Sequence, residues 1–141
     1  MRIHHIGVVV NNMDEALKLY HKMFGLTPVH AARSAPEHGL KMVSLPVGGS
    51  GEVFIEMIEP IGSESRFAKH LKERGEGLFH IAIFTEDWDE KVRELKEKGF
   101  VVEVQEAKAP GVSGTLKLGW LQPKDTRGVW FELINIDTPP L

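Results

Sequence analysis

The 141-residue sequence contains no cysteine, and this absence removes several kinds of chemistry at once. Disulfide bonds, thiolate metal ligands and a cysteine nucleophile are all excluded. Any metal site must therefore be built from histidine and oxygen ligands, a mixed set that suits Zn²⁺, Co²⁺, Ni²⁺, Mn²⁺ or Fe²⁺.

The sequence also lacks an excess of positive charge and a long apolar segment. Its 17 Lys and Arg residues against 20 Asp and Glu residues give a formal net charge of −3, so we expect no nucleic-acid partner. No apolar run approaches the ~20 residues of a membrane span, and the first residues lack the pattern of a signal peptide. We therefore expect a cytoplasmic protein with no membrane segment.

What the sequence does contain is an internal repeat, marked by similar residues that recur 74 to 76 positions apart. The clearest pairs are His5 and His80, Gly25 and Gly99, and Glu56 and Glu132. Self-similarity on this scale indicates two copies of one supersecondary unit, packed about a pseudo-twofold axis.

Each copy is predicted to form a strand, a helix and three further strands. Asn12 and Asp87 are capping residues with Glu three positions later, and Gly25 and Gly99 end the two helices. We expect one α+β domain over residues 1–141, which consists of a βαβββ module at 3–60, a helical linker at 61–77 and a second βαβββ module at 78–135.

Three local patterns add further expectations. Thr27–Ala32 is predicted to be an irregular strand, and the helical spacing of Phe24 and Trp88 favours core positions. Val47–Gly51 is predicted to connect two strands of a hairpin. It does not resemble a phosphate loop, because no Lys-Ser or Lys-Thr pair follows it.

Glu56 and Glu132 each lie inside an apolar run that is typical of a buried strand. A buried carboxylate is costly unless it is paired, protonated or bound to a metal. His5 and His80 occupy equivalent positions on the first strand of each module. If these strands are neighbours and the modules face each other, the four residues can converge on one metal ion.

A single histidine in a strand is more often a hydrogen-bonded structural residue than a ligand. Shared packing, however, explains why apolar positions recur and does not explain why a buried His and a buried Glu both recur. The doublet His4-His5 leaves a choice of ligand, and the register of the repeat selects His5 because Phe79 precedes His80.

The repeated module, with His on its first strand and Glu on its last, resembles the vicinal oxygen chelate superfamily, which includes glyoxalase I and extradiol dioxygenases. An ordered series of segments is similar to the methylmalonyl-CoA epimerase family: HIGVVV at 5–10, PEHG at 36–39, IEMIEP at 55–60, RGEGLFHIA at 74–82, PK at 123–124 and GVWFEL at 128–133. The similarity covers nearly the whole chain.

The resemblance implies a vicinal oxygen chelate-type fold with a metal site between curved mixed sheets. It implies one divalent ion per chain (Co, Zn, Mn or Ni), held by His5, Glu56, His80 and Glu132; a Gln often stands where Glu56 is. The reaction implied is an isomerisation that interconverts (R)- and (S)-methylmalonyl-CoA by 1,1-proton transfer through a metal-stabilised enediolate. A homodimer is also implied.

A 1,1-proton transfer needs an acid/base group on each side of the reacting carbon. Glu37 in the Pro-Glu-His-Gly turn is the first candidate, and Met42 stands where some family members carry the second carboxylate. Glu132 is therefore a candidate both as ligand and as base, with a metal-bound water as the alternative. The basic residues Lys117, Lys124 and Arg127 are candidates for contacts to the phosphates of the acyl-CoA substrate.

Two other functions remain open at this point. A glyoxalase I-type lyase, or another enzyme of the superfamily, would keep the metal and change the substrate. A non-catalytic protein of the same fold would bind a small molecule between its modules. Fold alone does not choose among these uses.

Overall fold

The computed structural model describes residues 1–47, 53–107 and 114–136, so most of the predicted Val47–Gly51 connection lies outside the described residues. The chain divides into two compact units. The first unit consists of residues 6–79, and the second consists of residues 1–5 together with 80–141. In the part of the chain that is described, no helix is both long and apolar enough to cross a membrane.

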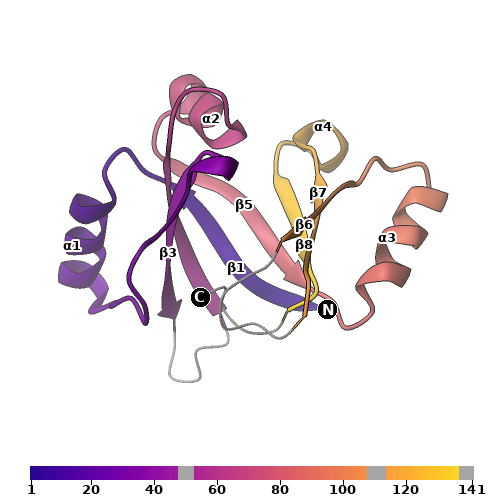
Figure 1. Cartoon of the computed structure of the whole chain (residues 1–141), viewed down its shortest axis with the longest axis horizontal. Coiled ribbons are helices and arrows are strands. Elements are labelled where there is room, and N and C mark those ends of the chain that lie inside the picture. The colour runs from indigo at the N-terminus through magenta and orange to yellow at the C-terminus, as the bar shows by residue number, and fades with distance from the viewer. Residues whose placement is uncertain (48–52, 108–113, 137–141) are drawn as a thin grey trace. The chain divides into compact units, whose positions relative to one another are not determined.

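The order of elements confirms the predicted repeat of strand, helix and three strands (Figure 1). The first copy contains β1 (Arg2–Val9), α1 (Met13–Phe24), β2 (Arg33–Ala35), the 3-10 helix η1 (Pro36–His38), β3 (Leu40–Val47) and β4 (Val53–Pro60). The helix α2 (Arg66–Arg74) follows. The second copy contains β5 (Gly77–Phe84), α3 (Trp88–Glu97), β6 (Glu103–Ala107), β7 (Leu116–Leu121), α4 (Pro123–Thr126) and β8 (Trp130–Ile134).

In the first unit the strand order is β2-β3-β4-β1, and β3 pairs with β4 in antiparallel register. Met13 of α1 packs against Val43 and Met57, which are at most 4% exposed, so α1 covers one face of this sheet. Because side chains alternate along a strand, Glu56 lies on the face of β4 that is turned away from α1.

In the second unit the strand order is β5-β8-β7-β6, with β5 parallel to β8 and the other pairs antiparallel. Trp88 of α3 packs against Leu121 and Leu133, and its indole N–H donates to the carbonyl of Leu133 at 3.0 Å. Gly119 permits this close approach, because a Cβ there would lie 3.3 Å from the Trp88 ring. α3 therefore covers one face of this sheet.

Two strands run from one unit into the other. β1 begins in the second unit and continues from Ile6 in the first, whereas β5 begins in the first unit and continues from His80 in the second. His5 is thus the last residue of β1 in the second unit, and His80 is the first residue of β5 there. The exchange brings the two histidines of the repeat into the same compact unit.

The predicted helix ends are confirmed. Asn12 accepts a hydrogen bond from the backbone N–H of Glu15 at 3.0 Å, and Asp87 does the same for Glu90 at 3.1 Å. Gly25 follows α1 in the left-handed region, with φ of 69°. The caps explain why α1 and α3 begin and end close to their predicted limits.

Two local predictions are wrong. Thr27–Ala32 forms no strand, and the nearest strand, β2, begins at Arg33. Pro28 lacks the N–H that a strand ladder needs, which the alternating pattern of this segment does not reveal. Phe24 is 63% exposed rather than buried, because it is the last residue of α1 and its ring lies beside Tyr20 at the helix end.

The turn that carries Glu37 is held in place by Gly39, which gives a testable prediction. Gly39 has φ of 68°, and a Cβ there would lie 2.8 Å from Cβ of Ser65, the N-cap of α2. Gly62 has a similar φ of 73° but open space around it, so it is a matched control.

We expect Gly39→Ala to lower the free energy of unfolding by about 2–4 kcal/mol, from backbone strain and overlap together. Gly62→Ala should cost only the strain, about 1 kcal/mol. Urea denaturation of both variants measures the difference, and equal losses would show that the contact with Ser65 does not constrain the turn.

Candidate metal centre

Three buried ligand-type side chains meet in the second unit. Nε2 of His5 lies 2.8 Å from Nε2 of His80, and both nitrogens lie close to Oε2 of Glu132, at 3.1 and 3.4 Å respectively. The residues are between 2% and 4% exposed. We call His5, His80 and Glu132 the three-residue cluster; their ligand atoms all lie within 4.8 Å of one another.

The pairing of β5 with β8 places two members of the cluster. Ala82 is directly opposite Glu132, so His80, two residues before Ala82, lies on the same face of the sheet as the carboxylate. Leu133 and Phe131 alternate with Glu132 and pack on the α3 side. The cluster therefore occupies the face of this sheet that α3 does not cover.

The separations within the cluster fit ligands that surround a single divalent ion. Two ligand atoms bound ~2.1 Å from one metal lie ~3.0 Å apart in an octahedron and ~3.4 Å apart in a tetrahedron. The three observed separations, from 2.8 to 3.4 Å, fall close to this range. Two imidazoles and one carboxylate are also a donor set that binds first-row divalent metals.

The electrostatics of the cluster favour a cation at its centre. Two imidazole lone pairs 2.8 Å apart repel each other unless a proton or an ion lies between them. Burial raises the pKa of Glu132, but hydrogen bonds from His5 and His80 and their positive charge outweigh burial and lower it to about 2. The carboxylate is thus held ionised, as a metal ligand must be.

Aromatic side chains surround the cluster on the same face of the sheet. Trp120 of β7 is opposite Glu132 in the strand register, is 4% exposed, and its ring centroid lies 5.1 Å from that of His80. Trp130 lies next to Trp120, with centroids 6.2 Å apart. These rings exclude water and lower the local dielectric, which strengthens interactions between the cluster and a bound charge.

Glu56, the fourth predicted ligand, belongs to the first unit. It is 7% exposed and is paired with Ser44 of β3 in the strand register. Its position in β4, on the face away from the helix, is equivalent to that of Glu132 in β8. Its membership of the metal set stays a prediction.

Glu37, the predicted acid/base, lies in η1 on the surface of the first unit. Its side chain is 64% exposed, and its carboxylate lies 4.0 Å from Nε2 of His38. An exposed pair at this distance contributes little to stability, so the carboxylate is available for other contacts. Its acid/base role stays a prediction.

The three predicted phosphate contacts differ in their surroundings. Lys117 donates from Nζ to both carboxylate oxygens of Asp89 at 2.7 Å and lies above the Trp88 ring, on the α3 side of the sheet. Lys124 is exposed in α4, and Arg127 is exposed just after it. The structure therefore does not bring Lys117 to the cluster, and the CoA role of all three residues stays a prediction.

Arg127 has an unusual backbone. Its φ of 63° lies in the left-handed region, where among the described residues every other positive φ belongs to glycine. It serves as the C-cap of α4, with its backbone N–H donating to Pro123. Nothing in the spacing of the sequence predicts this short helix.

His4 is the residue of the centre that the sequence patterns miss. It is 0% exposed, and its Nδ1 lies 2.7 Å from Nδ1 of His5. The doublet itself was the signal, but the register of the repeat treats the two histidines as alternatives for one role. The structure instead joins them through a hydrogen bond.

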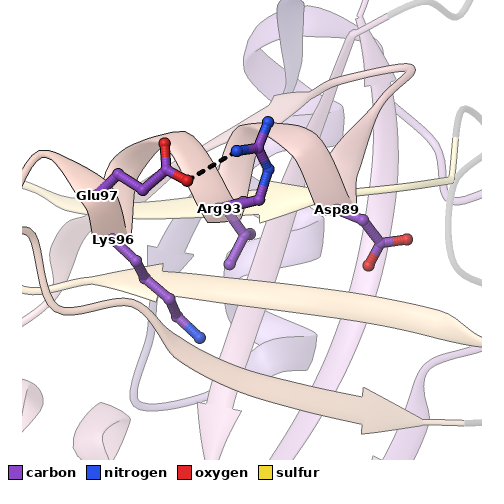
Figure 2. A pocket seen from close by; sticks show the side chains of 5 residues that line it. Asp89, Arg93, Lys96 and Glu97 are labelled. Atoms are coloured by element: carbon purple, nitrogen blue, oxygen red, sulfur yellow. Dashed lines mark hydrogen bonds and ion pairs between the residues drawn. The ribbon is translucent and has the colours of Figure 1, made fainter.

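A shallow depression lies on the surface of α3 (Figure 2). It is lined by Asp89, Val92, Arg93, Lys96 and Glu97, which all come from this one helix. Arg93 donates to Glu97 at 2.7 Å across its rim, as the dashed line shows. Asp89, Arg93 and Glu97 are held in ion pairs on the helix surface, so we do not assign the depression a function.

The fold and the three-residue cluster are those of a vicinal oxygen chelate protein, in which metal ligands come from a βαβββ repeat. Comparison with family profiles agrees, because the profile of the glyoxalase/bleomycin resistance protein/dioxygenase superfamily matches residues 4–115. The chain therefore belongs to this superfamily, and the predicted fold class is confirmed.

Within the superfamily, the chain falls in the methylmalonyl-CoA epimerase family. It is 32% identical to the mitochondrial methylmalonyl-CoA epimerase of Bos taurus over 133 residues, which are 94% of this chain and 73% of that protein. The predicted family is thereby confirmed.

Solved structures give the same result. A variant of the Streptomyces coelicolor methylmalonyl-CoA epimerase in complex with 2-nitronate-propionyl-CoA is 28% identical, with a TM-score of 0.82, covering 95% of this chain and 96% of that one. A methylmalonyl-CoA epimerase in complex with methylmalonyl-CoA and NH4+ is also 28% identical, with a TM-score of 0.83 and 98% of both chains covered.

Proposed function

We propose that this protein is a divalent-metal-dependent epimerase that interconverts (R)- and (S)-methylmalonyl-CoA by moving the proton on C2 from one face to the other. The observation that carries the proposal is the buried cluster of His5, His80 and Glu132, whose separations suit a single ion. The similarity to epimerases solved with methylmalonyl-CoA or a related acyl-CoA supports the choice of substrate.

His5, His80 and Glu132 would hold the ion, with Glu56 as a fourth ligand. The ion itself supplies positive charge that stabilises negative charge on the thioester oxygen when C2 loses its proton. The two imidazoles contribute no charge, whereas Glu132 and Glu56 contribute one negative charge each. A divalent ion would therefore keep a net charge of +1 with the three-residue cluster alone and would be neutralised when Glu56 also binds, so its effect on the thioester oxygen would depend on direct contact with that oxygen. We propose that this ion is Co²⁺, Zn²⁺, Mn²⁺ or Ni²⁺.

Glu37 would transfer the proton on one side of C2. Gly39 fixes the backbone of the turn that carries Glu37, while the exposed carboxylate at the end of the side chain is free to move. On the other side, the sequence offers Glu132 or water. A carboxylate that binds a cation is a weaker base than a free one, which makes Glu132 better suited to ligation than to proton transfer.

Lys124 and Arg127 would contact the phosphates of CoA. Both are exposed near one end of α4, where their charges are accessible to a ligand. Lys117 would have to release Asp89 before it could take part.

A homodimer and a cytoplasmic location complete the proposal. Sedimentation velocity tests whether the protein is a dimer.

Exchange of the C2 proton with solvent tests the proposed activity. Protein reconstituted with Co²⁺ is incubated with methylmalonyl-CoA in D₂O, and mass spectrometry follows deuterium at C2. We expect metal-dependent exchange at least ~10³-fold faster than with chelated protein, since metal stabilisation of the charge is worth several kcal/mol.

The same preparation is assayed with the hemithioacetal of methylglyoxal and glutathione, the substrate of a glyoxalase I-type lyase. Turnover of that compound without C2 exchange would replace the epimerase with the lyase. Full metal occupancy with neither activity would contradict both enzymes and favour a binding protein.

A further inference from the structure

The buried residue His4 has no place in the proposed chemistry, although it adjoins a proposed ligand. Its side chain is completely buried, which is unusual for a histidine without a structural or functional partner. Its ring meets that of His5 edge to face, with centroids 5.0 Å apart. The closest atoms are the two Nδ1 nitrogens, 2.7 Å apart, which is a hydrogen-bond distance.

Only one of these two nitrogens can be the donor. If His5 uses the lone pair of Nε2 to bind a metal, a neutral His5 must carry its proton on Nδ1. That N–H then points at Nδ1 of His4, which must accept and must carry its own proton on Nε2. Metal binding through Nε2 of His5 would therefore determine the tautomers of both rings.

We propose that His4 is a positioning residue for the metal centre, which accepts the Nδ1–H of His5 and thereby fixes the tautomer and the orientation of that ligand. A ligating histidine usually donates its second ring N–H to a carboxylate, a carbonyl or water. Here the acceptor is an imidazole from the preceding residue of the same strand. This inference rests on the metal set of the proposed function.

The proposed role of His4 predicts how substitutions of this residue affect the ligand His5. Because Nδ1 is the ring nitrogen nearest the backbone, asparagine at residue 4 can present its Oδ1 near the same point, whereas phenylalanine keeps a flat ring without an acceptor. His4→Asn should therefore preserve the ligand, and His4→Phe should not. His70→Phe is the matched control, since His70 is a partly buried histidine in ring contact with Phe79 in the first unit.

Zn²⁺ affinity is measured for the full chain by competition with a chromogenic chelator. We expect His4→Phe to bind Zn²⁺ 10- to 100-fold more weakly, the usual cost of losing such a partner. His4→Asn and His70→Phe should bind like the unaltered protein. Equal affinity of His4→Phe and the unaltered protein would overturn the role of His4, and circular dichroism shows whether each variant is folded.

Nitrogen-15 NMR of the Zn²⁺-loaded, histidine-labelled protein reads the tautomers without reference to activity. The expected result is a protonated Nδ1 on His5 and a protonated Nε2 on His4. A protonated Nδ1 on His4 overturns the proposal, because it makes His4 the donor. If the unaltered protein takes up no Zn²⁺, Co²⁺, Mn²⁺ or Ni²⁺, the metal set itself fails, and the inference about His4 fails with it.

Discussion

Glu132→Gln is expected to abolish metal binding and epimerisation together, while the protein stays folded. The substitution keeps the size and hydrogen-bonding shape of the side chain but removes the negative charge of the three-residue cluster. The three-residue cluster then has no anionic ligand, and a neutral amide oxygen attracts a divalent ion more weakly than a carboxylate at the same distance. We expect metal affinity to fall by more than ~100-fold, because loss of a mere hydrogen-bond partner of a ligand already costs 10- to 100-fold.

The loss of activity should follow from the loss of metal. If stabilisation of the developing charge is worth about 4 kcal/mol, exchange at C2 falls by about 10³-fold. Metal analysis after dialysis and the D₂O exchange assay measure the two effects on the same sample. Excess metal should restore little activity, since the cluster still lacks its carboxylate.

Glu59→Gln provides the control for Glu132→Gln. Glu59 is a partly buried carboxylate in β4 that accepts the backbone N–H of Met13 at 2.7 Å, and glutamine retains an oxygen for that bond. It should bind metal and catalyse exchange normally. Stoichiometric metal in Glu132→Gln, at the affinity of the unaltered protein, would remove Glu132 from the ligand set.

Local signals in the sequence account for much of the fold. Asn12 and Asp87 each cap a helix through a side-chain oxygen, and this interaction depends only on residues three positions apart. The strands around Glu56 and Glu132 are apolar and β-branched enough to be recognised in isolation. The residues that determine each of these helices and strands lie close together in the sequence, so local sequence patterns are enough to predict them.

The errors concern residues whose environment depends on distant parts of the chain. The spacing of Phe24 is that of a core residue, but α1 ends there and leaves the side chain 63% exposed. The apolar pair Phe100 and Val101 likewise resembles the start of a strand, whereas β6 begins at Glu103 and both residues are more than 40% exposed. Hydrophobic periodicity indicates which residues lie on the same face of a helix or strand, but it does not indicate where that helix or strand ends.

The candidate site could be predicted because the repeat places two histidines at equivalent positions, whereas the role of a single histidine in a strand would have been ambiguous. The exchange of strands places His5 with His80 and Glu132 in the second unit, and no local pattern reveals this. The role of His4 was hidden for a related reason. A repeat identifies what is common to both copies, and His4 has no counterpart, because Phe79 precedes His80.

Glu37→Gln is expected to separate proton transfer from metal binding. Glu37 is not a member of the three-residue cluster, and its side chain is 64% exposed, so the variant should bind metal and fold normally. Loss of one general acid/base group typically costs 10²- to 10⁴-fold, and we expect epimerisation to fall by that amount in both directions.

Exchange should distinguish the two enantiomers of methylmalonyl-CoA in this variant. If one group acts on each face of C2, Glu37→Gln cannot remove the proton from one enantiomer but can still remove and return it on the other. Deuterium should therefore enter only one of the two, without inversion, when each is incubated separately in D₂O.

The variant Glu64→Gln removes an exposed carboxylate of the first unit that hydrogen-bonds only to the neighbouring Ser63 among the contacts described, and it should behave like the unaltered protein. Epimerisation that persists in Glu37→Gln at the same level as in Glu64→Gln would exclude Glu37 as the base. Equal loss of exchange for both enantiomers, with metal retained, would mean that Glu37 serves both faces of C2. The pattern of deuterium entry thus reports how many groups move the proton, which neither the sequence repeat nor the cluster determines.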